Sequence, residues 1–269
     1  MLRSLEALAE ALPDGALVGV PADYSGVPMA LTMALLRRRT RGLRLFCLPT
    51  GHLQVDVLIG AGAVAEVETS AVSLGEFGLA PCFSRACEHS EVVVRDSTCP
   101  AMHAQLTATE RGVPFMPMRG LIGSDVLAHR PDWRVVDNPL SDGGDPLVLL
   151  PAIKLDVAVF HAPFADEEGN VWIGRRRELA TLAHAAERSL VTVEAIRPGS
   201  IFEREGTAAG GLSALYVEAI AVAAKGAAPL GLGDVYGVDA AALGAYAKAA
   251  RTREGFRQWL DARLAAVAA

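Results

Sequence analysis

Short apolar runs alternate along the chain with longer segments in which apolar residues recur every three or four positions. The runs at 16–20 and 43–49 are rich in Leu and Val, as in strands that are buried on both faces. Between them, residues 28–39 have a helical period, with Pro28 in the first turn. Residues 52–59 are apolar at a length that suits either a short helix or a strand. This alternation predicts a parallel sheet covered by helices.

The middle of the chain continues the same order. Residues 91–95 predict a strand, residues 100–111 a helix and residues 113–118 a further strand, so we expect another β-α-β unit of the parallel sheet. Residues 120–145 are rich in Gly, Asp, Pro and Ser. A segment of that length and composition is more typical of a functional loop than of a linker between domains.

The second half contains the most continuous apolar run of the chain, at residues 156–162, and we predict a fully buried strand there. A turn at 165–170, a helix at 177–189 and a strand at 190–196 follow. Residues 216–224 suit either a strand or a helix, and we favour a strand.

Both ends of the chain are predicted to be helical. The first helix extends to about Leu12, and the Ala-rich segment 239–269 is helical with Gly255 as its weak point. No internal repeat or low-complexity tract separates these regions. A chain of 269 residues with 51% hydrophobic composition fills one large core, so we expect a single domain over residues 1–269.

The charge balance argues against a nucleic-acid partner. The chain has 25 Lys and Arg against 31 Asp and Glu, a net charge of -6 and a pI near 5.6. The densest basic run, 37–41, follows an apolar helical stretch, and we interpret it as the solvated end of that helix. No basic block of the kind that follows a phosphate backbone is present.

Nothing in the sequence suggests secretion or a membrane. Glu6 and Glu10 interrupt the N-terminal apolar residues at helical spacing, unlike a signal peptide, and no apolar run approaches the roughly 20 residues that span a bilayer. The four cysteines form no C-x-x-C pair, which favours reduced thiols. We therefore expect a soluble, cytoplasmic protein without membrane contacts.

One motif resembles a nucleotide site without the required context. Residues 60–65, GAGAVA, match the G-x-G-x-x-A pattern. A dinucleotide fingerprint must open a long helix, whereas a short β-branched stretch follows here. The sequence also lacks a P-loop, a G-x-S-x-G elbow and any His, Cys, Asp and Glu spacing typical of metal ligands, so we expect no bound metal.

Two loop motifs occur in an informative order. Residues 114–125, PFMPMRGLIGSD, combine a strand with a Gly-rich loop, and residues 156–174, DVAVFHAPFADEEGNVWIG, combine a buried strand with a tight turn. With this order and spacing, residues 12–225 resemble the alpha subunits of family I coenzyme A transferases. The resemblance is greatest to the glutaconate CoA-transferase type and to the related subunits of steroid-ring-opening CoA hydrolases.

The resemblance implies an α/β fold of the superfamily shared with ribose-5-phosphate isomerase and glucosamine-6-phosphate deaminase. It also implies a partner beta subunit in a hetero-oligomer, coenzyme A as a substrate, and no metal or redox cofactor. In this family a glutamate carboxylate attacks an acyl-CoA thioester, and in the glutaconate type that glutamate belongs to the beta subunit. The substrates are an acyl-CoA and a carboxylic acid.

The resemblance and the loop positions together indicate where a substrate would bind. Arg119, at the end of a predicted strand, suits a substrate carboxylate or an ion pair with Asp125, and Ser124 suits an acyl oxygen or a cap. The residue after Gly169 suits the turn itself. The candidate substrate-binding residues are Gly19, Gly26, Arg119, Gly123, Ser124, Asp125 and Asn170. The first loop, 19–26, departs from the Gly-rich family loop by carrying Pro and Asp.

Three side chains of this chain are candidates for catalysis. In the steroid-ring hydrolases, the alpha subunit has a working glutamate at the position that corresponds to Cys99. With Pro100 in the first helical turn, we expect Cys99 to be the N-cap, where free amides favour a thiolate, and His103 to lie on the same helix face. Buried packing is the alternative for the thiol. Glu68 is the best internal carboxylate, and a solvated position is the alternative.

The leading hypothesis is the alpha subunit of a two-subunit CoA-transferase that acts on a short or dicarboxylic acyl-CoA. A second hypothesis keeps the fold and assigns CoA-ester hydrolysis or carbon–carbon bond cleavage, because the loop at 19–26 is altered and Cys99 replaces a glutamate. A third hypothesis is a non-catalytic regulatory subunit that binds a ligand.

Overall fold

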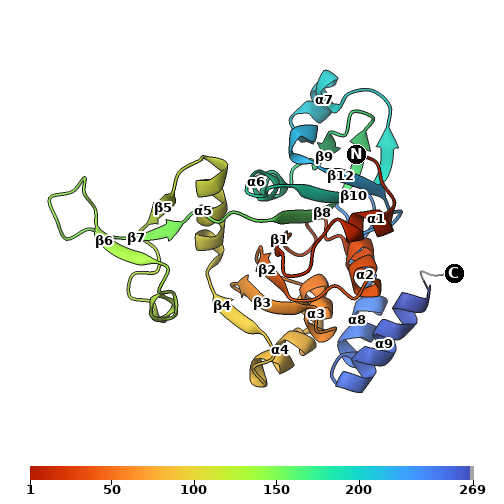
Figure 1. The fold of residues 1–269 in the computed structure, drawn as a ribbon, viewed down its shortest axis with the longest axis horizontal. Helices are drawn as coiled ribbons and strands as arrows, with labels where there is room; N and C mark the ends of the chain where they lie inside the picture. The colour runs from red at the N-terminus through yellow and green to blue at the C-terminus, as the bar shows by residue number, and fades with distance from the viewer. Residues whose placement is uncertain (267–269) are drawn as a thin grey trace.

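The computed structural model of the protein describes residues 1–266, and within that range seven parallel strands form the central sheet. This arrangement confirms the prediction of a mostly parallel α/β fold (Figure 1). In their order across the sheet, the strands are β12 (Ala219–Val222), β10 (Ser189–Arg197), β8 (Val157–Asp166), β1 (Leu17–Val20), β2 (Leu43–Cys47), β3 (Val64–Thr69) and β4 (Val93–Asp96).

Strand β8 is longer than β1 and extends past its carboxyl end. On this extension, β9 (Val171–Trp172) pairs antiparallel to β8 and β11 (Gly211–Leu212) pairs antiparallel to β9. The turn at 167–170 that joins β8 and β9 confirms the predicted turn. The sheet therefore continues on one side beyond the carboxyl end of β1, and one wall of the candidate site is built there.

Helices cover both faces of the central sheet (Figure 1). One face packs against α1, α2, α3 and α4, and the other against α5 and α6. The helices span Leu5–Glu10 (α1), Met29–Arg37 (α2), Leu53–Gly60 (α3), Pro81–Glu88 (α4), Cys99–Glu110 (α5), Glu178–His184 (α6), Glu205–Ala208 (α7), Ala240–Ala249 (α8) and Arg253–Ala266 (α9). Among the described residues, no helix has the length and apolar content that crossing a membrane requires.

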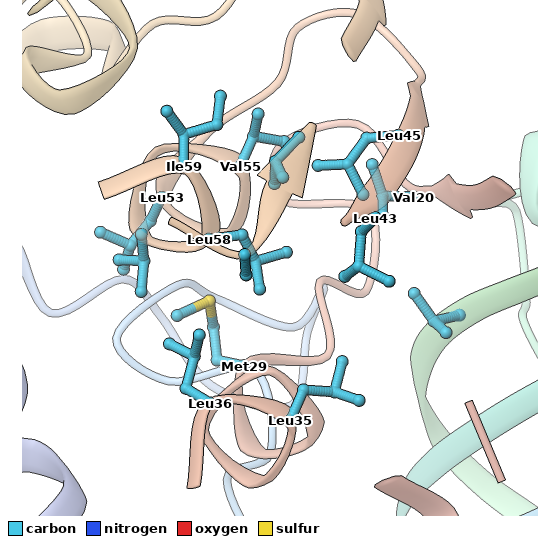
Figure 2. Packing of buried hydrophobic residues seen from close by; sticks show 14 of the residues in the cluster. Val20, Met29, Leu35, Leu36, Leu43, Leu45, Leu53, Val55, Leu58 and Ile59 are labelled. Atoms are coloured by element: carbon cyan, nitrogen blue, oxygen red, sulfur yellow. The ribbon is translucent and has the colours of Figure 1, made fainter. Parts of the chain in front are cut away.

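The sequence of β2 is nearly continuously apolar because its side chains are buried on both faces of the sheet. Leu43 and Leu45 point into the cluster beneath α2 and α3, which Figure 2 shows from close by. Phe46 and Leu48 belong to the cluster on the opposite face, with α5 and α6. Each of these four side chains is at most 1% exposed, so each contributes roughly 1.5–3 kcal/mol of burial.

The prediction for residues 113–118 was wrong in one respect. The strand exists as β5 (Phe115–Met118), but it belongs to a separate antiparallel sheet with β7 (Pro146–Pro151) and β6 (Arg134–Asp137). Figure 1 shows this sheet projecting from the central one beside α5. The predicted long loop, 120–145, likewise contains β6 and the 3-10 helix η2 (Asp125–His129).

The predicted C-terminal helical segment is confirmed for its described part, as α8 and α9; residues 267–269 lie outside the described residues. The expected weak point at Gly255 is wrong, because the helix is interrupted at 250–252 and Gly255 lies in the first turn of α9. Tyr246 of α8 is fully buried and donates a 2.5 Å hydrogen bond to Asp56 of α3. Burial raises the pKa of the Asp56 carboxyl, and the hydrogen bond from Tyr246 offsets part of that rise. Phe256 and Trp259 of α9 pack on the Tyr246 ring, so these helices belong to the core of the domain.

Candidate active-site cleft

A cleft of about 510 Å³ opens beside the extended part of β8. Its walls come from the loop after β1, from β8 and β9, and from the loop at 232–235. The carboxyl ends of parallel strands are where ligands bind in open α/β sheets, and a volume of this order is typical of small-molecule sites. We therefore take this cleft as the candidate active site.

The loop after β1 reaches the cleft through a close backbone contact. Gly26 has φ +79°, and a Cβ built on it would lie 2.1 Å from the carbonyl oxygen of His161. The amide of His161 donates a 2.6 Å hydrogen bond to the Gly26 carbonyl oxygen. Only a residue without a side chain fits both the left-handed backbone and this contact, so Gly26 fixes the loop against β8.

His161 occupies the inner end of the cleft. Its Nδ1 lies 2.8 Å from the hydroxyl of Thr192 and its Nε2 lies 2.7 Å from the Glu194 carboxylate. The side chain of His161 is fully buried. Burial lowers the pKa of His161 more than the neighbouring Glu194 raises it, so the imidazole is neutral near pH 7.

Glu194 holds several parts of the cleft together. Besides His161, the amides of Lys225 and Gly226 and the hydroxyl of Tyr236 donate hydrogen bonds to its carboxylate. Burial alone would raise the pKa of Glu194, but the hydrogen bonds from His161 and the other donors outweigh it and lower that pKa. Because Tyr236 follows the loop at 232–235, this carboxylate positions that wall of the cleft.

The outer wall is a stack of planar groups. The rings of Phe164 and Trp172 lie 5.1 Å apart between centroids at an interplanar angle of 9°. The guanidinium carbon of Arg197 lies 3.8 Å from the centroid of the Phe164 ring. Stacking of this kind orients the aromatic rings and the guanidinium together. All three residues line the cleft.

Next to the cleft, Tyr24 of the loop after β1 contacts a buried histidine, His52. The Tyr24 ring packs on His52, with centroids 5.3 Å apart. His52 is 2% exposed, and neither of its ring nitrogens has a hydrogen-bond partner among the described residues. Burial lowers the pKa of His52 to about 4, so the folded protein holds it as a neutral imidazole.

This buried imidazole predicts acid sensitivity. The unfolded chain protonates His52 near its ordinary pKa of 6.5, whereas the folded chain does not. The free energy of unfolding should therefore fall as the pH drops from about 6.5 towards 4, by roughly 2 kcal/mol for this residue. Urea denaturation at pH 7 and pH 4.5 measures the difference. In His52→Gln the difference should shrink; an unchanged difference would show that other groups cause it.

The structure brings few of the predicted substrate-binding residues to the cleft. Gly26 lines it. Gly19 instead packs within β1, where a Cβ would lie 2.5 Å from Leu155 and 2.8 Å from Leu182. Asn170 donates to Asp166 at 2.8 Å and accepts from the Ala214 amide at 2.9 Å, so its contacts are those of the β8–β9 turn.

The other four candidates come from the motif at 114–125 and lie in the part of the chain that forms the antiparallel sheet of β5, β6 and β7. They are Arg119, Gly123, Ser124 and Asp125. The expected pair of Arg119 with Asp125 is wrong, because Arg119 forms a two-point ion pair with Asp145 at 2.9 and 2.6 Å. Ser124 caps η2 by accepting a hydrogen bond from the Val126 amide. None of the four residues lines the cleft.

Cys99 is the first residue of α5 and is exposed, which corrects the expectation that it is the N-cap. The N-cap is Thr98, whose hydroxyl accepts a hydrogen bond from the Ala101 amide. No hydrogen bond joins Cys99 to His103 within the described residues. The helix start is therefore capped without the thiol.

Glu68, at the end of β3, is 6% exposed rather than solvated. Its Oε1 lies 2.8 Å from Nη1 of Arg130, whose side chain is 1% exposed, and its Oε2 lies 3.5 Å from Nε of Arg95. Arg130 also pairs with Asp132 at 2.8 Å and stacks on Trp133. Burial raises the pKa of Glu68, and the Arg130 guanidinium offsets part of that rise. This carboxylate is part of a buried ion-pair network.

Most residues that line the cleft are not among the residues predicted from sequence. The hydrophobic pattern marks His161 only as the end of a strand, and it does not single out Arg175, Arg176 or Arg197. The available signal was that His161 lies near the end of the predicted strand 156–162 and that Arg197 directly follows the predicted strand 190–196, since the carboxyl ends of parallel strands place ligand contacts in this fold. Among residues 1–266, no three His, Cys, Asp or Glu side chains are grouped so as to hold a metal ion.

Comparison with known proteins identifies the family. The model of the coenzyme A transferase family matches residues 3–212. The cholesterol ring-cleaving hydrolase IpdA subunit of Rhodococcus jostii is 30% identical over 87% of this chain and 81% of the relative. One of the subunits of glutaconate CoA-transferase from Acidaminococcus fermentans is 27% identical over 76% of this chain and 70% of the relative. An uncharacterized protein of Archaeoglobus fulgidus is 31% identical over 95% of this chain, which spans 57% of that protein's length.

Solved structures share the fold. The crystal structure of glutaconate coenzyme A-transferase from Acidaminococcus fermentans matches with a TM-score of 0.89 and 23% identity, covering 97% of this chain and 87% of that one. The structure of a variant of the decarboxylase AibA/AibB matches with a TM-score of 0.83 and 28% identity, covering 97% of this chain and 98% of that one. This chain therefore belongs to the coenzyme A transferase family of enzymes and has the fold of glutaconate CoA-transferase.

Proposed function

We propose that this chain is the alpha subunit of a two-subunit CoA-transferase, which moves coenzyme A between a short or dicarboxylic acyl-CoA and an acceptor carboxylic acid. The nucleophilic glutamate belongs to the partner subunit, and the two chains form a hetero-oligomer. The names of the relatives support a partner chain, since glutaconate CoA-transferase and 3-oxoadipate CoA-transferase each match through one named subunit.

The contacts that hold the Glu68 and Glu194 carboxylates carry this proposal. Glu68 is held by Arg130 and Arg95, and Glu194 accepts hydrogen bonds from a histidine, a tyrosine and two amides. Either carboxylate would have to give up these partners to attack a thioester, which makes it a poor nucleophile. The cleft itself is open and lined by His161 and aromatic side chains, which suits binding of an acyl group.

The reaction balances without a cofactor. The partner's carboxylate attacks the thioester carbonyl, and the carbon–sulfur bond breaks to give an acyl anhydride and CoA thiolate. The thiolate then attacks the glutamyl carbonyl of the anhydride and releases the first acid as a carboxylate. The resulting glutamyl-CoA thioester reacts with the acceptor carboxylate through the same two steps in reverse.

In this scheme the present chain binds and orients the acyl group rather than forming bonds. The neutral His161 and the ionised Glu194 fix the inner end of the cleft, and the stack at Phe164 supplies an apolar wall. Holding the acyl group in a fixed orientation lowers the entropic part of the barrier. Cys99 and Glu68 have no bond-forming role here.

Intact-mass analysis of the two-chain complex tests which chain is modified. After incubation with acyl-CoA, borohydride reduces a glutamyl-CoA thioester to an alcohol, so the modified chain loses one oxygen and gains two hydrogens. We expect that change on the partner chain only. A parallel sample quenched in acid without borohydride would preserve an acyl group on a thiol.

The Cys99→Ala variant completes this test. Because the thiol does not take part in the proposed reaction, the variant complex should give the same trapped partner chain and the same rate of CoA exchange. An acyl adduct on the present chain that disappears in Cys99→Ala would contradict the proposal and make the thiol the nucleophile.

CoA-ester hydrolysis or carbon–carbon bond cleavage is the second candidate, and the loop after β1 favours it. Asp23 is half-buried there, beside Tyr24 of the cleft, and its carboxylate accepts no hydrogen bond from the described residues. Burial raises the pKa of Asp23, and Arg176 offsets part of the rise. A carboxylate in this state can accept a proton from water. Two relatives are named a ring-cleaving hydrolase and a decarboxylase.

Product analysis separates the two candidates. A transferase releases no free CoA: without an acceptor acid the CoA stays in the glutamyl-CoA thioester, and with an acceptor it passes into a new acyl-CoA. A hydrolase releases free CoA with water alone, and this release should be lost in Asp23→Asn. Release of CoA without acceptor would replace the transferase proposal with the second candidate.

A further inference from the structure

The cleft carries an excess of positive charge. Three arginines line it, Arg175, Arg176 and Arg197, whereas the described residues contribute two acids, Asp234 in the lining and the ionised Glu194 behind His161. The histidine in the cleft is neutral near pH 7, because burial lowers its pKa. The protein as a whole is acidic, with a net charge of -6. A local positive excess on an acidic protein attracts an anionic ligand to this cleft.

Arg175 and Arg197 have no acidic partner among the described residues, whereas Arg176 has contacts within the protein. Arg176 donates a 3.3 Å hydrogen bond to the Tyr24 carbonyl oxygen and lies 3.9 Å from Glu178. Within residues 1–266, neither Arg175 nor Arg197 forms an ion pair. Their guanidinium groups can therefore bind a ligand without giving up a partner in the protein.

Arg197 is also oriented for binding. One face of its guanidinium lies on the Phe164 ring, at 3.8 Å from the centroid. The N–H groups of a guanidinium point outwards in its plane and match the two oxygens of a carboxylate. Because the stacked ring fixes that plane, less entropy is lost when a carboxylate binds. The apolar stack of Phe164 and Trp172 continues beside it.

We infer that the cleft binds an acyl group whose apolar body lies along the Phe164–Trp172 stack and whose far end carries a second carboxylate, held by Arg175 and Arg197. This inference rests on the proposed function and narrows its substrate class to dicarboxylic acyl groups. The two arginines act as specificity-determining residues, because a monocarboxylic acyl group of equal length leaves them without an anion.

Coenzyme A is itself anionic, so its phosphates are the other source of an anion for these arginines. Three free ligands separate the sources: suberate, which has two carboxylates, octanamide, which has the same chain length and no carboxylate, and coenzyme A. Binding of each is measured by calorimetry on the two-chain complex. Because no turnover is needed, the result does not depend on whether the complex transfers CoA.

The test variant is Arg175→Gln/Arg197→Gln, and the matched control is Arg177→Gln. Arg177 is an exposed neighbour that does not line the cleft and donates to the Ala209 carbonyl oxygen. The unmodified complex should bind suberate more tightly than octanamide. The double variant should lose roughly tenfold in suberate affinity, as expected for charge-assisted hydrogen bonds at a partly exposed site, and should keep its affinity for octanamide. The control should bind all three ligands as the unmodified complex does.

Two results would overturn the inference. If the double variant lost affinity for coenzyme A and kept its affinity for suberate, the arginines would hold phosphates. If suberate and octanamide bound equally well to the unmodified complex, the cleft would not recognise a second carboxylate. A complex that binds suberate selectively but exchanges no CoA would disprove the proposed function and leave the assignment of the arginines standing.

Discussion

Replacing Gly26 by alanine is expected to lower the free energy of unfolding by about 3 kcal/mol. The left-handed backbone at φ +79° costs a residue with a side chain roughly 1–2 kcal/mol. The added Cβ would lie 2.1 Å from the His161 carbonyl oxygen, and relieving such an overlap typically costs a further 1–3 kcal/mol. Denaturation in urea at pH 7 measures the change.

Gly123→Ala is the matched control for this prediction. Gly123 has φ +80°, and none of the described residues comes within 4 Å of the place that an added Cβ would occupy. Only the backbone cost of about 1 kcal/mol therefore applies. Equal losses in the two variants would show that the contact between the first loop and β8 does not matter. The Gly26 variant should also lose acyl-CoA binding, since its loop forms part of the cleft.

Replacing Arg130 by methionine is expected to destabilise the protein by about 3–5 kcal/mol, the range for breaking a buried ion pair. The substitution leaves Glu68 in the interior with Arg95 as its remaining cation, at 3.5 Å rather than 2.8 Å. It also removes the hydrogen bond to the Asp96 carbonyl oxygen and the stacking on Trp133. Thermal and urea denaturation of the purified variant test this directly.

Two further variants test whether the loss in Arg130→Met comes from the buried ion pair. Arg119→Met removes a two-point ion pair with Asp145, but this arginine is 68% exposed, so the melting temperature should hardly change. The double variant Arg130→Met/Glu68→Leu removes both charges and should recover part of the loss, because no carboxylate then remains buried beside a missing cation. If Arg130→Met alone were as stable as the unmodified protein, the buried ion pairs of Glu68 would not contribute to the free energy of unfolding.

The sequence by itself determined the main sheet and the family. The nearly continuous apolar run at 156–162 indicates burial on both faces, and residues 157–162 form the first part of β8, between β10 and β1 inside the sheet. The C-terminal helices follow from Ala-rich helical periodicity, with Asp239 as the N-cap of α8. Such local signals are strong because they depend on residues only a few positions apart.

The tertiary structure alone decided how residues far apart in the chain combine. Residues 115–118 have the pattern of a strand, but periodicity does not name a pairing partner, and β5 joins β7 rather than the parallel sheet. Glu68 meets Arg130 across 62 positions and His161 meets Glu194 across 33. The cleft exists only because several such segments converge. Hydrophobic pattern encodes which side of an element is buried, whereas the identity of its neighbours depends on packing of the whole chain.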